Sequence, residues 1–277
     1  MTRNARVTES VQMSDIDALA GVERSMDASA YDRIARLYDP WSQSVVEDVA
    51  FYVAEARKAA GRAGLPPGTP VIELGVGTGR IAVPVAESGI NVIGVDTSQG
   101  MLEVCRSRAE AAGVAERLDL RVGDFRHPPV RERVALVMCP FRAYLHLSDD
   151  GQRLAALEAA RALLVPGGLL AFDVFAPSRE DVEDTHGRWI EREPGIWERA
   201  HWDEDARRLT LDVRGNEVET TLGLSWISPA EWRGLLERAG FEIEACYGWF
   251  DRTPYTGGED SIWLARRPND EHREGQV

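Results

Sequence analysis

The hydrophobic positions of residues 71–175 change repeatedly between short apolar runs and helical spacing. Runs such as 71–74 and 134–139 predict buried strands, because a strand covered on both faces has no polar side. Stretches such as 99–112 have apolar residues at helical spacing and predict helices between the strands, with Ser98 as the N-cap of this one. This alternation is typical of parallel strands joined by right-handed crossovers. With two further strands near 241–266, it predicts an α/β fold, a Rossmann-like, doubly wound sheet of seven mostly parallel strands with helices on both faces.

Residues 178–227 have a different pattern. Segments such as RRLTLDVRG and ETTLGLSWI alternate polar and apolar residues and predict an antiparallel β insertion with one exposed face. Ser228 then starts a predicted helix, with Pro229 at its first position and Glu231 three residues after the cap. We therefore divide the chain into a disordered tail (1–25), an N-terminal helical cover (26–64), a Rossmann-like core (65–177), the antiparallel insertion (178–227), the C-terminal part of the core (228–267) and a charged tail (268–277).

The strongest chemical signal is the glycine-rich loop from Glu73 to Gly79, ELGVGTG, between a predicted strand and a predicted helix. Glycine permits a tight turn and lets a ligand approach the backbone closely, although a tight turn without a ligand has the same sequence. Asp96 ends the next strand, where a carboxylate can bind both ribose hydroxyls of a nucleotide. Asp124 ends the third strand, where a side chain can meet an adenine edge while Phe125 lies against the ring.

The spacing of the loop distinguishes two classes of nucleotide. The dinucleotide fingerprint G-x-G-x-x-G requires its third glycine at position 80, and that position is Arg80. A helix N-terminus alone suits a diphosphate, but Glu73 beside the loop suits a cationic amino group. The loop therefore favours an adenosyl cofactor with an ammonium group over NAD.

Four motifs carry a resemblance to a known family. ELGVGTGR, GVDTSQGML, GDFR and LVPGGLLAFDVF, in this order, resemble those of the class I S-adenosylmethionine-dependent methyltransferases of the small-molecule type. The resemblance covers residues 70–175 and also fits the C-terminal helix and last strand pair. It implies S-adenosyl-L-methionine as cofactor, S-adenosyl-L-homocysteine as product, and an insertion that covers the acceptor.

The same resemblance implies a set of cofactor-binding residues. The two N-terminal tyrosines of this set have packing as an equal alternative. The set is Tyr31, Tyr38, Glu73, Gly75, Gly77, Gly79, Asp96, Thr97, Met101, Gly123, Asp124, Phe125, Cys139 and Phe141.

Methyl transfer from a sulfonium is an in-line displacement that needs alignment but no metal and no covalent nucleophile. A base is useful when the acceptor is a hydroxyl or a protonated amine. His146, just past the fourth strand, is the first candidate and Tyr144 the second, with a structural hydrogen bond as the alternative for His146. Large aromatic residues could wall the acceptor pocket or only cover the edge of the core. These are Trp189, Trp197, Trp202, Trp226, Trp249, Tyr247 and Tyr255.

Composition narrows the partners and the compartment. The chain has 277 residues, with 32 Lys+Arg against 46 Asp+Glu and a formal net charge of -14, so its field repels nucleic acid and anionic lipid. No apolar run approaches the ~20 residues of a membrane span, and the polar N-terminal residues lead us to expect no secretory signal. Three separated cysteines match neither a disulfide framework nor a zinc site. The arginine-rich composition indicates a GC-rich bacterial genome.

We expect a cytoplasmic bacterial enzyme, monomeric or homodimeric, that binds no metal, nucleic acid or membrane. Its predicted function is methyl transfer from S-adenosylmethionine to N or O of a small-molecule acceptor. The alternatives are a protein methyltransferase and a non-catalytic S-adenosylmethionine-binding regulatory module.

Overall fold

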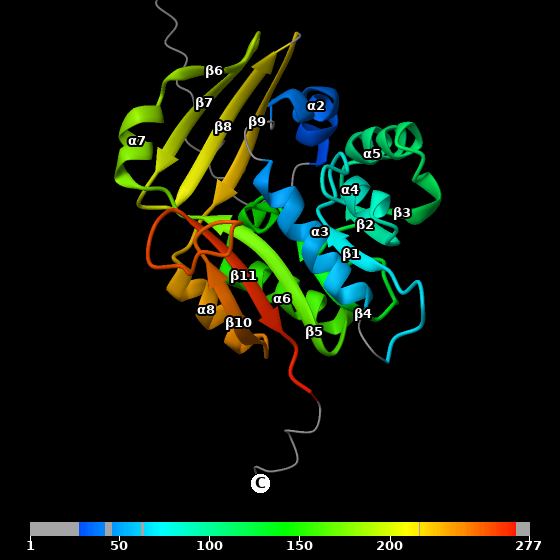
Figure 1. The fold of residues 1–277 in the computed structure, drawn as a ribbon. Helices are drawn as coiled ribbons and strands as arrows, with labels where there is room; N and C mark the ends of the chain where they lie inside the picture. The colour runs from blue at the N-terminus through cyan, green and yellow to red at the C-terminus, as the bar shows by residue number, and fades with distance from the viewer. Residues whose placement is uncertain (1–27, 42–45, 62–63, 216, 270–277) are drawn as a thin grey trace, which may run out of the picture.

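The computed structural model describes residues 28–41, 46–61, 64–215 and 217–269. They form a seven-stranded mixed sheet with helices on both faces and a separate four-stranded antiparallel sheet (Figure 1). The predicted tail 1–25 and positions 270–277 of the predicted C-terminal tail lie outside the described residues. The predicted fold class is confirmed.

The seven-stranded sheet has the order β10-β11-β5-β4-β1-β2-β3. Only β11 runs against its neighbours; it pairs antiparallel with both β5 and β10. The parallel central strands are short and apolar because helices cover both of their faces. The strands are β1 (Val71–Leu74), β2 (Val92–Asp96), β3 (Leu118–Val122), β4 (Val134–Cys139), β5 (Leu164–Phe175), β10 (Glu242–Tyr247) and β11 (Asp260–Arg266).

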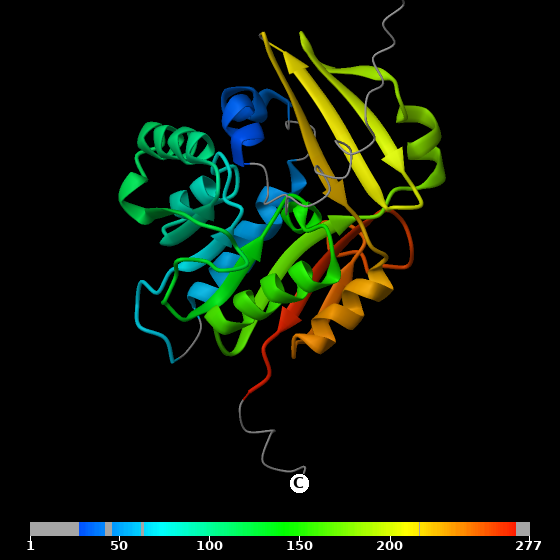
Figure 2. The same ribbon diagram turned by 180° about the vertical axis from the view of Figure 1, so that it is seen from behind.

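Two groups of helices cover the sheet (Figures 1 and 2). One face packs against α3 (Glu47–Ala60), α4 (Ala82–Glu87) and α5 (Gln99–Ala111). The other packs against α6 (Asp150–Leu163) and α8 (Pro229–Arg238). The carboxyl ends of the parallel strands are thereby left free at one edge.

The helix starts follow the predicted capping chemistry. The Ser98 hydroxyl accepts the backbone N–H of Met101 and starts α5. Ser228 starts α8 with a complete capping box, in which the Glu231 side chain reaches back to the cap. Both predicted caps are confirmed, because a free N–H at a helix start needs a nearby oxygen wherever the chain enters the helix.

Two elements differ from the predicted pattern. The PGG sequence at 166–168 predicts the end of a helix with a strand after it, but strand β5 already begins at Leu164, so Gly167 and Gly168 lie inside the strand. Both glycines are paired there, since Gly167 N donates to Arg267 O (2.7 Å) and Arg267 N to Gly168 O (2.8 Å). The insertion also contains an unpredicted short helix, α7 (Arg179–Thr185).

The insertion otherwise forms the predicted antiparallel sheet, which we call the lid. Its strands are β6 (Trp189–Glu193), β7 (Ile196–Asp203), β8 (Arg208–Gly215) and β9 (Val218–Ser225). Helix α2 (Ala28–Trp41) lies between the lid and α5, and packs against β9 and α5 (Figures 1 and 2). Buried Ile34 and Leu37 of α2 pack in one cluster with Met101, Val213 and Leu222.

Among the residues that the structure describes, no helix combines the length and the apolar composition needed to cross a bilayer. Nor do three or more His, Cys, Asp or Glu side chains of this described part gather as metal ligands.

Candidate functional site

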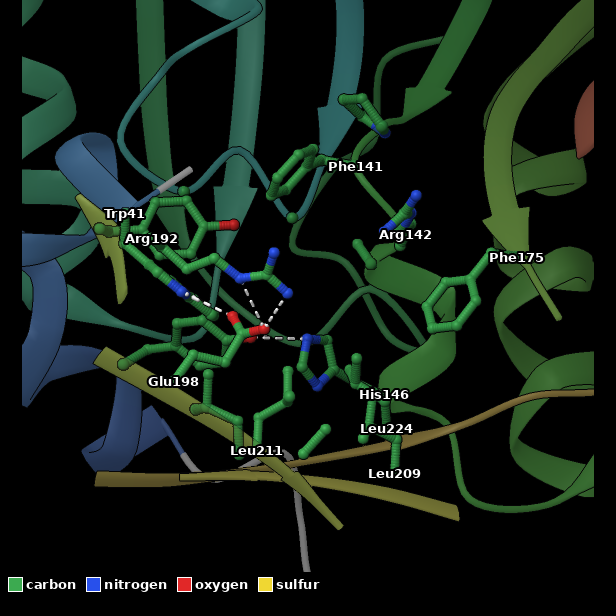
Figure 3. Close-up of a pocket in the computed structure, with 18 of the residues that line it drawn as sticks. Trp41, Phe141, Arg142, His146, Phe175, Arg192, Glu198, Leu209, Leu211 and Leu224 are labelled. Carbon is green, nitrogen blue, oxygen red and sulfur yellow. Dashed lines mark hydrogen bonds and ion pairs between the residues drawn. The ribbon is translucent and has the colours of Figure 1, made fainter. Parts of the chain in front are cut away.

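A cavity of about 430 Å³ lies between the carboxyl edge of the parallel sheet, α2 and the lid (Figure 3). Its wall on the sheet side, the cofactor half, is made by the glycine loop after β1 and by residues after β2. Its other wall, the acceptor half, is made by inward side chains of the lid. The predicted residues that line it are Tyr31, Tyr38, Gly75, Gly77, Asp96, Thr97, Met101, Phe125, Phe141 and His146.

The glycine loop leaves space for a ligand at one position and fills space at another. Gly77 has a φ of +52°, and a Cβ added there would meet no protein atom within 4 Å. At Gly79, by contrast, a Cβ would lie 2.5 Å from Cys105 Sγ on α5. Gly77 therefore faces the open cavity, while Gly79 does not line it and permits tight packing of the loop on α5.

Asp96 is held at the end of β2 by backbone donors. Its Oδ2 accepts Gly77 N at 2.8 Å and its Oδ1 accepts Ser98 N at 2.9 Å. Burial raises the pKa of Asp96, while these N–H bonds oppose the increase. The carboxylate is thus fixed in the cavity wall with lone pairs left for a diol.

Glu73 lies behind the loop and not in the cavity wall. Its side chain is buried, and its Oε2 has no hydrogen-bond partner. Burial raises the pKa of Glu73 well above its usual range. An unpartnered buried carboxylate oxygen is costly, and an ammonium group within reach would remove that cost.

Arg80 occupies the position at which a dinucleotide-binding loop has its third glycine. Its Nη1 donates to Oδ1 of buried Asp48 on α3 at 2.9 Å. Its guanidinium also lies 4.3 Å from the ring centroid of Phe141. Arg80 therefore ties α3 and the segment after β4 to the glycine loop.

Two carboxylates hold α2 over the cavity. Asp32 accepts Ser98 Oγ at 2.6 Å and Gly100 N at 2.8 Å, at the start of α5. Asp39 accepts Thr78 Oγ1 at 2.5 Å in the glycine loop. This attachment places Tyr31 and Tyr38 in the cavity wall.

His146 and Tyr31 form a hydrogen-bonded pair where the two halves meet. His146 Nδ1 lies 3.2 Å from Gly223 O, which can only accept, so Nδ1 carries the proton. His146 Nε2 then accepts the Tyr31 hydroxyl at 2.8 Å. Burial lowers the pKa of His146 to about 4. The imidazole is therefore neutral at pH 7 and a weak base.

Four of the predicted residues on this edge lie outside the cavity wall. Asp124 pairs with Arg126 (Oδ2 to Nε 2.9 Å), which lowers the Asp124 pKa although burial opposes this. A Cβ at Gly123 would meet Pro129 at 2.4 Å, so this glycine serves packing. Cys139 and Tyr144 are buried in the core.

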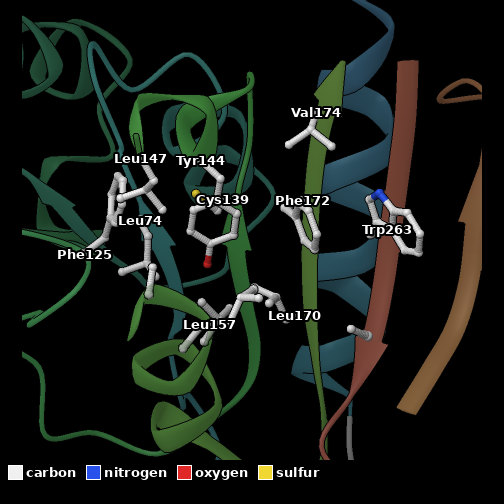
Figure 4. Packing of buried hydrophobic residues seen from close by; sticks show 14 of the residues in the cluster. Leu74, Phe125, Cys139, Tyr144, Leu147, Leu157, Leu170, Phe172, Val174 and Trp263 are labelled. Carbon is white, nitrogen blue, oxygen red and sulfur yellow. The ribbon is translucent and has the colours of Figure 1, made fainter. Parts of the chain in front are cut away.

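Tyr144 illustrates how one turn separates neighbouring side chains. The short 3-10 helix Ala143–His146 directs Tyr144 inward, 5.6 Å from the ring of Phe125 and 5.3 Å from that of Phe172 (Figure 4). The same turn directs His146 into the cavity. Tyr144 is only 1% exposed and does not reach the acceptor space.

Of the predicted wall aromatics, only Trp202 lines the cavity. Trp189 lies under two guanidiniums, 3.9 Å from Arg214 and 4.6 Å from Arg199. Trp197 also lies near Arg214, at 5.9 Å. Trp226 is buried, 5.5 Å from the ring of Trp202.

The two tyrosines of this group lie at the end and beyond the end of β10. The Tyr247 ring lies 6.3 Å from that of Phe51. The Tyr255 hydroxyl donates to Gly258 O at 3.0 Å, within the loop before β11. Of the lid tryptophans, only Trp202 lines the cavity, because successive residues of a strand face opposite sides.

The floor of the acceptor half was missed in the sequence. It consists of Leu209 and Leu211 of β8 and Leu222 and Leu224 of β9 (Figure 3). The alternation that predicted the lid also separates its two faces, but it does not indicate which face meets the cavity.

Charged groups border this floor on two sides. On one side Glu198 accepts Arg192 Nη2 at 2.6 Å and Trp41 Nε1 at 2.9 Å, which joins the lid to α2. On the other side Arg142 donates to Asp260 at 2.9 Å. The remaining charged or polar residues that line the acceptor half are Asp181, Thr185 and Glu259.

Comparisons with known proteins agree with this geometry. Residues 71–168 match the model of a methyltransferase domain. The chain is 25% identical over 239 residues to the cypemycin N-terminal methyltransferase of Streptomyces sp, which covers 82% of this chain and 89% of that protein. The structure of the CcbJ methyltransferase from Streptomyces caelestis is similar with a TM-score of 0.76 and 25% identity, covering 87% of this chain and 99% of that one.

Another relative is named for a different acceptor. The chain is 24% identical over 180 residues to the tRNA (carboxymethyluridine(34)-5-O)-methyltransferase of Arabidopsis thaliana, a match that covers 64% of this chain. It spans only 39% of that relative's length, and about two fifths of the length of others. The relatives therefore share the domain and differ in their acceptors.

Proposed function

Because the chain belongs to the class I S-adenosylmethionine-dependent methyltransferases, we propose that it methylates an amine nitrogen of a small molecule with an apolar body. One observation carries the proposal: a single cavity runs from the glycine loop and Asp96 to the leucine floor of the lid. A methyl donor and an apolar acceptor can therefore meet inside one enclosed space.

The residues of the cofactor half fit this group. Asp96 would hold the ribose hydroxyls, and the unpartnered Oε2 of Glu73 would receive the ammonium group, directly or through water. The space beside Gly77 would admit the methionine part. When bound, S-adenosylmethionine supplies a methyl group that its sulfonium already activates for displacement.

The acceptor half favours a cation or amine over an anion. Its charged lining consists of four carboxylates, Asp181, Glu198, Glu259 and Asp260, against the two guanidiniums of Arg142 and Arg192. The leucine floor supports an apolar body beside this amine. The whole cavity measures about 430 Å³ and the cofactor would fill part of it, so the acceptor half suits a small molecule or a peptide end.

The His146–Tyr31 pair supports nitrogen over oxygen as the methylated atom. An alcohol requires a strong base, whereas an amine attacks through its own lone pair once it is unprotonated. Neutral His146 accepts a hydrogen bond from the Tyr31 hydroxyl and so orients the Tyr31 oxygen, which keeps a lone pair for an acceptor N–H. The chain's own residues then align the nucleophile and exclude water, without removing a proton from a weak acid.

The N-terminal amine of a peptide is the second candidate. The extended similarity to a relative named as an N-terminal methyltransferase supports it, as does the same acidic lining. The alternative functions are methylation of an oxygen atom and a regulatory module that binds the cofactor without turnover.

Titration calorimetry with S-adenosylmethionine, S-adenosylhomocysteine and NAD tests the cofactor class. We expect binding of the first two and none of NAD. Release of S-adenosylhomocysteine with panels of hydrophobic amines, matched alcohols and short peptides then tests the acceptor. Turnover confined to alcohols would contradict the nitrogen proposal, and tight cofactor binding without turnover on any panel would favour the regulatory module.

A further inference from the structure

The turn that separates the two halves of the cavity is strained. Strand β4 ends at Cys139, and the next residues include Phe141 with φ +54° and Arg142 with φ +63°. Left-handed conformations cost free energy for residues with a Cβ, and two in succession require support from the surrounding structure. Both side chains line the cavity.

One buried carboxylate provides this support. Asp173 of β5 accepts Phe141 N with Oδ1 at 2.8 Å and Arg142 N with Oδ2 at 3.1 Å. Tyr52 of α3, which is fully buried, donates its hydroxyl to the same Oδ1 at 2.5 Å. Asp173 itself is buried and does not line the cavity.

The turn sends its two side chains to opposite halves (Figure 3). The Phe141 ring lies 6.2 Å from that of Tyr38 and under Arg80, on the cofactor side. The Arg142 guanidinium lies 4.6 Å from the Phe175 ring centroid, on the acceptor side. Fixing the two backbone N–H groups therefore fixes both walls at once.

We propose that Asp173, oriented by Tyr52, is a positioning residue that holds the Phe141–Arg142 turn in its cofactor-binding conformation. This inference rests on the proposed function, because it requires that the cavity bind the methyl-donor cofactor. Neither residue belongs to the cavity wall, so their effect on the cofactor passes through the turn.

Protonation of Asp173 would release the turn. Protonation turns one carboxyl oxygen into an O–H donor. That donor then faces an N–H or O–H group that also donates, so one hydrogen bond is lost. Burial raises the pKa of Asp173 to about 6, while the Tyr52 hydroxyl lowers it. The other titratable or charged groups that act on it are Asp48 of α3, Arg142 of the turn, Tyr38 of α2, Arg80 of the glycine loop and Cys139 of β4; its neighbour on β11 is the apolar Ile262.

The test is the dissociation constant of S-adenosylhomocysteine, measured by calorimetry between pH 8.5 and pH 5. Asp173→Asn replaces one accepting oxygen by a donor, and we expect about fivefold weaker binding at pH 8.5. Tyr52→Phe keeps the carboxylate but removes the donor that lowers its pKa. The acidic midpoint of binding should therefore move to higher pH by about one unit, while the affinity at pH 8.5 should fall less than in Asp173→Asn, because the carboxylate still accepts both N–H groups of the turn.

Asp119→Asn on the exposed edge strand β3 is the matched control and should behave as wild type. The raised pKa of Glu73 also contributes to the pH profile of binding. Glu73 is present in the wild type and in every variant, so it does not change the difference between them. If Asp173→Asn does not fold, the midpoint shift of Tyr52→Phe still decides the question. Wild-type affinities and pH profiles in both variants would overturn the positioning role. Absence of S-adenosylhomocysteine binding in the wild type would instead refute the proposed function, and this inference with it.

Discussion

The two halves of the cavity are built in different ways. The centre of the cofactor half, the glycine loop and Asp96, lies within the continuous segment 71–125, and Phe141 adds a side chain from the turn after β4. The acceptor half gathers side chains from α2, α7, all four lid strands and the start of β11 with the residue before it. A site made from local backbone has a recognisable sequence, whereas a site made from distant side chains depends on how the elements pack.

The sharpest way to break the cofactor half is Gly77→Val. The new side chain would project into the cavity, and we expect about 100-fold weaker cofactor binding in calorimetry. Gly113→Val is the matched control, since Gly113 also has a positive φ (+71°) and open space around it, but lies after α5 outside the cavity wall. Equal affinities in the two variants would mean that the loop does not touch the cofactor.

Asp96→Ala should weaken cofactor binding at least about tenfold, because it removes charged hydrogen bonds worth ~1.5–3 kcal/mol. It also leaves Gly77 N and Ser98 N without their acceptor. Asp119→Ala on the exposed edge of β3 controls for the loss of a carboxylate. Unchanged affinity for S-adenosylhomocysteine would remove Asp96 from the ribose site.

His146 lies between the two halves, so His146→Ala should affect turnover and cofactor affinity differently. We expect turnover to fall about tenfold, because the Tyr31 hydroxyl loses its acceptor, while cofactor affinity changes little. Since burial lowers the pKa of His146 to about 4, its charge does not change between pH 6 and 8. A kinetic limb near pH 6.5 that His146→Ala abolishes would contradict the neutral role; exposed His127→Ala is the control.

Leu211→Ala should affect the acceptor half alone. Losing part of the apolar floor should raise the acceptor KM about fivefold and leave the cofactor dissociation constant unchanged. Thr210→Ala, the adjacent residue on the opposite face of β8, should leave both unchanged. A larger effect of Thr210→Ala than of Leu211→Ala would reverse the assignment of the two faces.

The smallest effect is expected for Trp189→Ala. Its ring packs under Arg199 and Arg214 away from the cavity, so both kinetic parameters should stay within about twofold of wild type. The melting temperature should fall, because about 0.5–1 kcal/mol of cation–π stabilisation is lost. A raised acceptor KM would return this tryptophan to the acceptor pocket.

The sequence predicted the layers of the fold, the order of strands and helices along the chain, and the helix caps. Each of these follows from local periodicity or from one hydrogen bond, as at Ser98 and Ser228. The sequence could not predict which residues meet across the cavity. Composition alone makes Trp189 and Trp202 equal candidates for the cavity wall, but strand register turns only Trp202 inward. Asp173 sits in a strand motif that looks like ordinary core, and only the turn it holds gives it a role.

Hydrogen bonds attach helix α2 to three other parts of the molecule, and this affects how the acceptor half can be engineered. Asp32 attaches it to α5, Asp39 to the glycine loop, and Trp41 to Glu198 on the lid. Replacing residues of this helix to admit a bulkier acceptor would also loosen the wall beside the nucleoside. Redesign for a new acceptor is therefore better started on β8 and β9, whose leucines border only the acceptor half.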